Sequence, residues 1–197
     1  MRMEPTILAW AHRHPQIRGV VLGGSRAKGT AQEGSDWDFG VLLDEEPSVE
    51  LVEHLTADVG LASERDANVA PQLERAFVIV SKSFRTEEGE IALNFTDVHD
   101  LDEAFDHKNY TIIEHQLEFL TSAKLIYDPQ GTVEAIRSRP FPEWAREKLI
   151  DDALGLAEWN IDKYRKARST LTRMLLKSNA LWFCAKAIAA HNGILLT

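Results

Sequence analysis

The side chains best suited to chemistry lie close together near the start of the chain. Gly23-Gly24-Ser25 ends an apolar run, and ten residues separate Ser25 from the pair Asp36 and Asp38. Glycines after a strand let the backbone approach an anion and present N–H groups to it, and a helix that begins there adds its N-terminal dipole. Because Ser25 adds a hydroxyl donor, the turn is predicted to bind phosphate. The predicted phosphate ligands are Gly24, Ser25, Arg26 and Lys28.

The two aspartates are predicted to bind metal together. Asp36 and Asp38 lie one residue apart at the start of an apolar run, so on a strand both side chains leave the same face. Adjacent carboxylates repel each other unless a cation lies between them, and Mg²⁺ prefers carboxylate and phosphate oxygens. A phosphate-binding turn beside this pair suggests metal-assisted transfer from a nucleoside triphosphate.

Two other phosphate motifs do not fit this stretch. The P-loop pattern Gly-x4-Gly-Lys-Ser/Thr is absent. The dinucleotide fingerprint fails because Gly24 and Gly29 are wrongly spaced and no parallel strand–helix–strand repeat follows. The simpler alternative is a glycine turn followed by two surface aspartates. We consider this alternative less favourable, because two carboxylates beside apolar strand residues lose part of their hydration, and a bound cation would offset that cost.

The rest of the chain predicts an α+β fold, in which an N-terminal mixed β-sheet domain flanked by helices precedes a C-terminal helical bundle. Residues 1–139 are expected to form the first domain and residues 140–197 the second, whose apolar end would also fit a natural chain that continues. Strands are expected at 17–22, 36–43, 76–81, 90–95 and within 124–131, with a turn at 85–89 that joins the third strand to the fourth as a hairpin. Helices are expected at 4–13, 25–30, 49–58, 102–106, 110–119, 132–138, 143–165 and 170–190.

The pattern Gly23-Gly24-Ser25-x10-Asp36-x-Asp38, with apolar residues on both sides, resembles the signature of the DNA polymerase β-like nucleotidyltransferase superfamily. Gly-Gly-Ser-Arg-Ala-Lys-Gly-Thr followed by Gly-Ser-Asp-Trp-Asp-Phe is most similar to the small bacterial branch. That branch holds aminoglycoside and lincosamide nucleotidyltransferases and the minimal nucleotidyltransferases. The order of sheet domain and helical bundle also resembles the antibiotic-modifying enzymes, which extends the resemblance to the whole chain, with residues 1–139 as the nucleotidyltransferase domain.

This resemblance implies a reaction and a set of ligands. Gly24 and Ser25 would hold the triphosphate, and Asp36 and Asp38 would hold two Mg²⁺ ions. The enzyme would move a nucleoside monophosphate, AMP from ATP or the equivalent from another nucleoside triphosphate, to a hydroxyl group of a small-molecule acceptor and release pyrophosphate. An aminoglycoside-like antibiotic is one such acceptor.

The family pattern also has a third carboxylate on a later strand, and here three residues compete for the position. Glu90 lies at the start of the predicted strand 90–95, and we expect it to be the third catalytic carboxylate. Asn94 is central in that strand but cannot act as a base, so its use would imply weakened catalysis. Asp97 lies just beyond the strand.

The composition limits the classes of binding partner and the cellular compartments that fit this chain. The net charge of -9 argues against a protein that coats nucleic acid, which needs a basic face. The single cysteine, Cys184, makes neither an intrachain disulfide nor a thiolate metal site, and fits a reducing cytoplasm. No apolar run is long enough to predict a membrane span. The apolar stripe of the helix at 170–190 predicts a bundle core or a dimer face, so the chain is expected to be a monomer or homodimer.

Two other functions stay open on the sequence alone. The chain would also fit an antitoxin or regulator of the minimal nucleotidyltransferase type that acts on a protein partner, although minimal members usually lack a long helical domain. It would also fit a member that binds nucleotide with impaired catalysis, because the third carboxylate is ambiguous.

Overall fold

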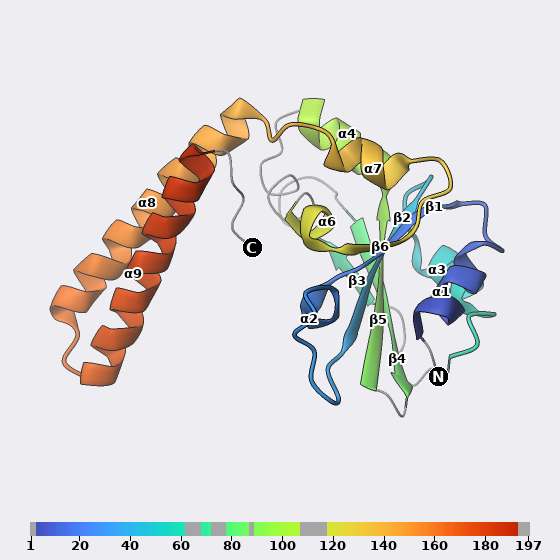
Figure 1. Ribbon diagram of the computed structural model, residues 1–197, viewed down its shortest axis with the longest axis horizontal. Helices are drawn as coiled ribbons and strands as arrows, with labels where there is room; N and C mark the ends of the chain where they lie inside the picture. The colour runs from blue at the N-terminus through green and yellow to red at the C-terminus, as the bar shows by residue number, and fades with distance from the viewer. Residues whose placement is uncertain (1–2, 62–67, 72–77, 87–88, 107–117, 193–197) are drawn as a thin grey trace. The chain divides into compact units, whose positions relative to one another are not determined.

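The computed structural model describes residues 3–61, 68–71, 78–86, 89–106 and 118–192. The chain divides into two units, Met1–Arg139 and Pro140–Thr197. The first unit contains a six-stranded mixed sheet with helices, and the second contains two long helices (Figure 1). The expected α+β class is confirmed.

Six strands form the sheet of the first unit. They are β1 (Ile17–Leu22), β2 (Trp37–Leu43), β3 (Asn68–Pro71), β4 (Val78–Thr86), β5 (Gly89–Asp97) and β6 (Lys124–Tyr127). Their order across the sheet is β3-β4-β5-β2-β1-β6. β2 runs parallel to β5, whereas the other neighbouring strands are antiparallel. The strand that carries Asp38 therefore lies between β1, which leads into the glycine turn, and β5, which carries Glu90.

Two of the helices, α1 (Met3–Ala11) and α3 (Val49–Thr56), cover one face of this sheet and enclose the main core with it. The other helices of the first unit are α2 (Gly24–Ala27), α4 (Val98–Asp106), α6 (Glu118–Ser122) and α7 (Thr132–Arg137). α1 and α3 lie side by side (Figure 1), and the Trp10 indole N–H of α1 donates to the Leu55 carbonyl at 2.7 Å. The Trp10 ring also meets Phe95 of β5 edge-on, with centroids 6.2 Å apart. This core holds the middle strands in place.

The opposite face of the sheet is approached by α6 and α7 at positions where the strands carry glycine. A Cβ on Gly19 would lie 2.4 Å from Val133 Cγ2 of α7, and a Cβ on Gly40 would lie 2.7 Å from Phe119 Cε1 of α6. Contacts this short are not available to any other residue type, so the two glycines let the helices come close. Asp38 belongs to this same face, because it alternates with Phe39 of the main core.

The element predictions were accurate for β1 and less so for the hairpin strand β4. We expected a strand at 76–81 and a turn from Arg85, but β4 continues to Thr86. The apolar alternation is interrupted at Lys82, a buried residue on the core-facing side. Its ammonium group pairs with the Glu53 carboxylate of α3 at 2.5 Å, which makes a lysine tolerable there. β3 was not predicted, and the helix expected at 110–119 lies outside the described residues except at its end.

The second unit consists of α8 (Glu143–Lys166) and α9 (Thr170–His191), which pack against each other. Small residues make much of the buried surface, namely Ala145, Ala153, Ala157, Ala180, Ala187 and Ala190. The large apolar residues of α9 are instead exposed, and we call this set the α9 stripe: Leu171, Met174, Leu175, Leu181, Trp182 and Ile188. The stripe therefore does not form the core between the two helices. No helix in the described ranges is long and apolar enough to cross a membrane.

Candidate active site

The predicted phosphate-binding turn touches the predicted metal ligand Asp38. The Gly23 N–H donates to the Asp38 carbonyl oxygen at 2.7 Å, which ties the turn to β2. Gly24 has φ +64°, a conformation that favours glycine, and a Cβ there would lie 2.8 Å from Asp38 Oδ2. The backbone of the turn and the carboxylate therefore occupy neighbouring positions that only a glycine allows.

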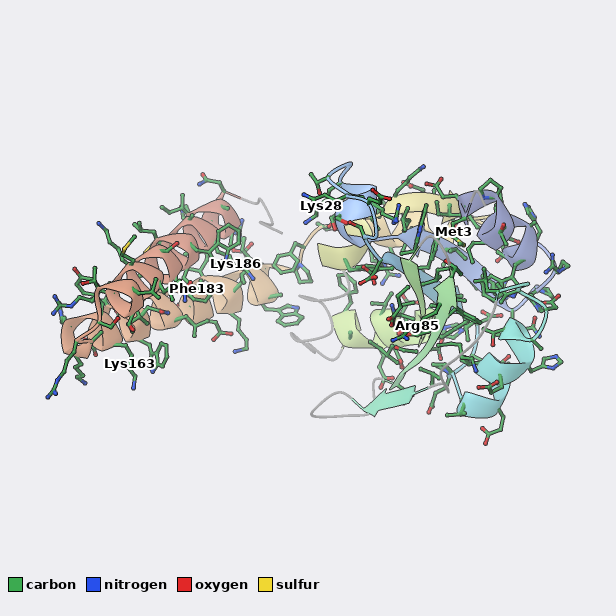
Figure 2. The ribbon with its side chains drawn as sticks, turned by 90° about the horizontal axis from the view of Figure 1, so that it is seen from below. Met3, Lys28, Arg85, Lys163, Phe183 and Lys186 are labelled. Atoms are coloured by element: carbon green, nitrogen blue, oxygen red, sulfur yellow. The ribbon has the colours of Figure 1, made fainter. Side chains whose placement is uncertain are left out.

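The helix after the turn is shorter than expected. α2 spans Gly24–Ala27, a single turn, where the sequence predicted residues 25–30. A helix this short has few aligned peptide dipoles, so backbone N–H groups and nearby side chains carry more of any anion affinity than the helix dipole does. Ser25 lies within this turn and is partly exposed, and Lys28 is exposed at the end of α2 (Figure 2).

Arg26 is engaged with the segment that leads into the aspartates. Its Nε donates to the carbonyl oxygens of Ser35 and Asp36, each at 3.1 Å. Its guanidinium carbon lies 3.9 Å from the centroid of the Trp37 ring. Sequence reasoning placed Arg26 among the phosphate ligands, whereas these contacts position the backbone of Asp36. The spacing of Arg26 and Trp37 gave no signal of this stacking.

Asp38 lies on β2 and is partly buried, whereas Asp36 lies directly before the strand, which begins at Trp37 and not at residue 36 as expected, and is exposed. Trp37 between them turns to the other side and packs against the main core, with its ring stacked on Phe39. Burial, and then the charges of Asp36 and Glu90, raise the pKa of the Asp38 carboxyl above its ordinary value. Three carboxylates therefore repel one another in this place, and a cation would relieve that repulsion.

The register between β2 and β5 places the three candidates for the third carboxylate. Asp38 pairs with Ala92, Gly40 with Asn94, and Leu43 with Asp97. Glu90 is one residue before the Trp37–Ile91 pair, at the end of the sheet where Asp36 lies. Asp97 lies at the other end, where its carboxylate accepts from the His99 N–H at 2.8 Å. The structure thus brings Glu90, and not Asp97, near the aspartate pair.

The sequence analysis missed a cationic side chain, Arg85, on the face of the sheet that carries Asp38. Arg85 of β4 is the cross-strand partner of Glu90, so both side chains leave the same face of the sheet. We had placed Arg85 in a turn because β4 was expected to end at residue 81. The signal that could have found it is the alternation of Ser81, Ser83 and Arg85 with residues of the core.

The donor set fits a metal ion that is completed by its substrate. Among the described residues, no group of three or more His, Cys, Asp or Glu side chains is arranged to hold a metal ion by itself. Mg²⁺ is commonly held by one or two carboxylates together with substrate phosphates, not by an all-protein cage. Asp36 and Asp38, with the glycine turn against Asp38 Oδ2, match that chemistry.

A glycine turn in contact with the Asp38 carboxylate, with Asp36 two residues before it, suits the binding of a metal–phosphate complex. The model of the polymerase beta nucleotidyltransferase family matches residues 6–130, more than half of the chain, so the chain belongs to this family. No curated protein matches the chain.

Three solved structures are among those similar to this chain. A nucleotidyltransferase-like protein from Exiguobacterium sibiricum 255-15 is 13% identical, with a TM-score of 0.45 over 100% of this chain and 59% of that one. Spectinomycin adenyltransferase from Enterococcus faecialis, with ATP and spectinomycin, is 12% identical, with a TM-score of 0.47 over 99% and 77%. A toxin–antitoxin with AMP-PNP is 15% identical, with a TM-score of 0.36 over 68% and 79%.

The chain spans 59% of the length of the first of these neighbours. The family assignment rests on the match to residues 6–130 alone.

The contact between Gly24 and Asp38 predicts unequal effects of two alanine substitutions. Gly24 and Gly29 both have positive φ, but a Cβ on Gly29 would meet nothing within 4 Å. Gly29→Ala should lower the free energy of unfolding by about 1 kcal/mol from backbone strain alone. Gly24→Ala adds a clash with Asp38 and should cost roughly 2–3 kcal/mol. Urea unfolding measures both.

A double variant isolates the contact. Gly24→Ala combined with Asp38→Ala removes the clashing carboxylate, so the added cost of Gly24→Ala should fall to that of Gly29→Ala. Equal costs for the two single substitutions would contradict the placement of Gly24 against Asp38.

Proposed function

We propose that the protein transfers a nucleoside monophosphate, AMP from ATP, to a hydroxyl group of a small-molecule acceptor and releases pyrophosphate. The observation that carries this proposal is the close approach of Gly24 to the Asp38 carboxylate, because it puts a phosphate-binding turn and a cation-binding group side by side. In this proposal residues 1–139 are the nucleotidyltransferase domain and residues 140–197 the helical domain.

The turn would bind the triphosphate of the nucleotide. Gly24 and Ser25 offer backbone N–H groups and one hydroxyl, and exposed Lys28 adds positive charge. Arg26 supports them indirectly, because its hydrogen bonds to the carbonyls of Ser35 and Asp36 fix the start of β2. Holding the nucleotide in one orientation favours in-line attack at its α-phosphorus.

The carboxylates would act on the metal and on the acceptor. Asp36 and Asp38 would hold two Mg²⁺ ions, which supply positive charge to the phosphate and acceptor oxygens when bound. Glu90, on the neighbouring strand, would accept the proton of the acceptor hydroxyl. The acceptor oxygen then forms a bond to the α-phosphorus, the bond from that phosphorus to the β-phosphate oxygen breaks, and pyrophosphate leaves.

The nature of the acceptor is inferred from the sequence motif and from the helical unit. The motif around Gly24 resembles that of the bacterial antibiotic-modifying branch, which supports a small molecule with a free hydroxyl, an aminoglycoside-like antibiotic among the candidates. The α9 stripe supports a second candidate function, in which the hydroxyl belongs to a protein partner bound by the helical unit. Incubation with labelled ATP separates the two, since the label would appear on a small molecule or on a protein.

Removing either carboxylate should abolish transfer. Asp36→Asn and Asp38→Asn should each lower kcat/KM for pyrophosphate release by roughly 100- to 1000-fold, because the metal loses a charged ligand. Asp44→Asn is the matched control, since Asp44 follows the far end of β2, where it pairs with Arg18. A coupled pyrophosphate assay with Mg²⁺, ATP and a panel of hydroxyl acceptors measures all three. Unchanged turnover in both site variants would refute the assignment.

Glu90 should be the third catalytic carboxylate. Glu90→Gln keeps the shape of the side chain but cannot accept a proton, so kcat should fall by about 100-fold. Asp97→Asn retains an oxygen for the His99 N–H and should leave kcat unchanged. A loss of kcat in Asp97→Asn but not in Glu90→Gln would place the third carboxylate at Asp97. Unchanged kcat in both variants would indicate that the site works without a third carboxylate.

A further inference from the structure

The α9 stripe lies on the side of its helix that is turned away from α8. Helical residues follow one another at about 100° around the axis, so the buried residues Ala180, Ala187 and Ala190 point almost opposite to the stripe. The six stripe residues are between 48% and 66% exposed. α9 is thus apolar on two opposite sides, of which one is buried in the hairpin with α8 and the other is exposed. A helix that is apolar all round is normally buried, so the stripe calls for a second packing partner.

The stripe belongs to a regular row of residues along α9, which we call the α9 seam. The seam consists of positions 171, 174, 178, 181, 185 and 188, which recur every three or four residues and are all exposed. This is the spacing of the a and d positions of a coiled coil, at which side chains of one helix pack between those of another. Leu175 and Trp182 widen the apolar surface along one edge of the seam. The seam is therefore suited to bind another α-helix.

Large and small residues alternate along the α9 seam in a way that favours a second α9 helix running in the opposite direction. With a two-fold axis between Asn179 and Ala180, each large residue near the axis meets a small one. The layers are then, from the centre outward, Leu181 with Ser178, Met174 with Ala185 and Leu171 with Ile188 of the second copy. A parallel pair would instead place two serines in one layer and two alanines in another, which would leave gaps in the packing.

The charges of α9 are compatible with this pairing. Arg173, Lys177 and Lys186 lie outside the seam, and α9 contains no aspartate or glutamate. In the antiparallel pair the cation nearest the axis, Lys177, faces Cys184 of the second copy and not another cation. The pairing therefore buries no charge and brings no like charges into direct contact.

The exposed area of the stripe matches what a stable dimer needs. A fully exposed side chain of this size presents about 200 Å², so the exposed fractions amount to roughly 700 Å² in each copy. Two copies would together bury about 1,400 Å², which is within the range of about 1,200–2,000 Å² for specific interfaces. A monomer rarely exposes a contiguous apolar patch of this size without an interaction that uses it.

We propose that the α9 stripe joins two copies of this chain into a symmetric dimer through an antiparallel pair of α9 helices. The same patch is used on both copies, as a two-fold interface requires. This inference does not depend on nucleotidyl transfer. It bears on the acceptor, because a stripe covered by a second copy is not free to bind a protein acceptor, as the second candidate function requires.

Sedimentation velocity over a range of about 1–100 µM tests the dimer. The natural protein should sediment with twice the mass of the chain. Leu181→Glu should raise the dissociation constant of the dimer at least about 100-fold, because two carboxylates would lose their hydration beside the central layers. Leu154→Glu is the matched control, since Leu154 is also exposed but lies on α8, and this variant should remain a dimer.

Three results of this experiment would each overturn the proposal. A monomeric natural protein would leave the stripe to a different kind of partner. A dimeric Leu181→Glu variant would place the interface outside the stripe, and loss of the dimer in Leu154→Glu would place it on α8. Leu181 is exposed within one copy, so an unchanged helical circular dichroism spectrum confirms that its variant is folded.

Distances between spin labels test the direction of the pair without disturbing the seam. The labels are attached to Thr172→Cys or to Lys177→Cys, each combined with Cys184→Ser. A helix rises about 1.5 Å per residue, so in the antiparallel pair the two labels at residue 172 should be about 15 Å further apart along the axis than the two at residue 177. A parallel pair would give similar distances at both positions, and that result would overturn the proposed pairing even for a dimeric protein.

Discussion

The approach of the Gly24 backbone to the Asp38 carboxylate is the constraint on which the candidate site depends. It requires β1 and β2 to be neighbours, a left-handed residue at the end of β1, and no side chain at that residue. The Gly23 hydrogen bond to the Asp38 carbonyl fixes the spacing, and the Arg26 contacts hold the segment before it. The turn proposed to bind phosphate and the carboxylate proposed to bind metal are thereby held against each other, which is what handling a metal–triphosphate complex needs.

Much of this could be predicted from the sequence because its signals are local. The spacing of Gly24, Ser25, Asp36 and Asp38 predicted the candidate site, which stays a prediction, and an apolar run bounded β1 correctly. A strand pair such as β4 and β5 follows from alternation and a turn, which are also local patterns. The family match over residues 6–130 agrees with the resemblance that those residues suggested.

What the sequence did not predict depends on contacts between distant residues. Lys82 broke the apolar alternation of β4, and only its pairing with Glu53 of α3 explains why the strand continues past it. The stacking of Arg26 on Trp37 was not predicted either, because nothing in the spacing of the two residues indicates it. The role of Gly40 was also hidden, since the ring that requires it comes from Phe119, far along the chain. Contacts between residues far apart in the chain do not appear in the periodicity of the sequence, so sequence patterns do not predict them.

The central claim is that the turn and the aspartate pair form one cation-dependent nucleotide site. Calorimetric titration of the natural protein with a non-hydrolysable ATP analogue, with and without Mg²⁺, tests it most directly. We expect binding at least about tenfold tighter with Mg²⁺, since the metal joins carboxylate and phosphate oxygens. We expect the same titration of Asp38→Asn to lose that difference. Equal affinity with and without Mg²⁺ in the natural protein, or no binding at all, would contradict the account.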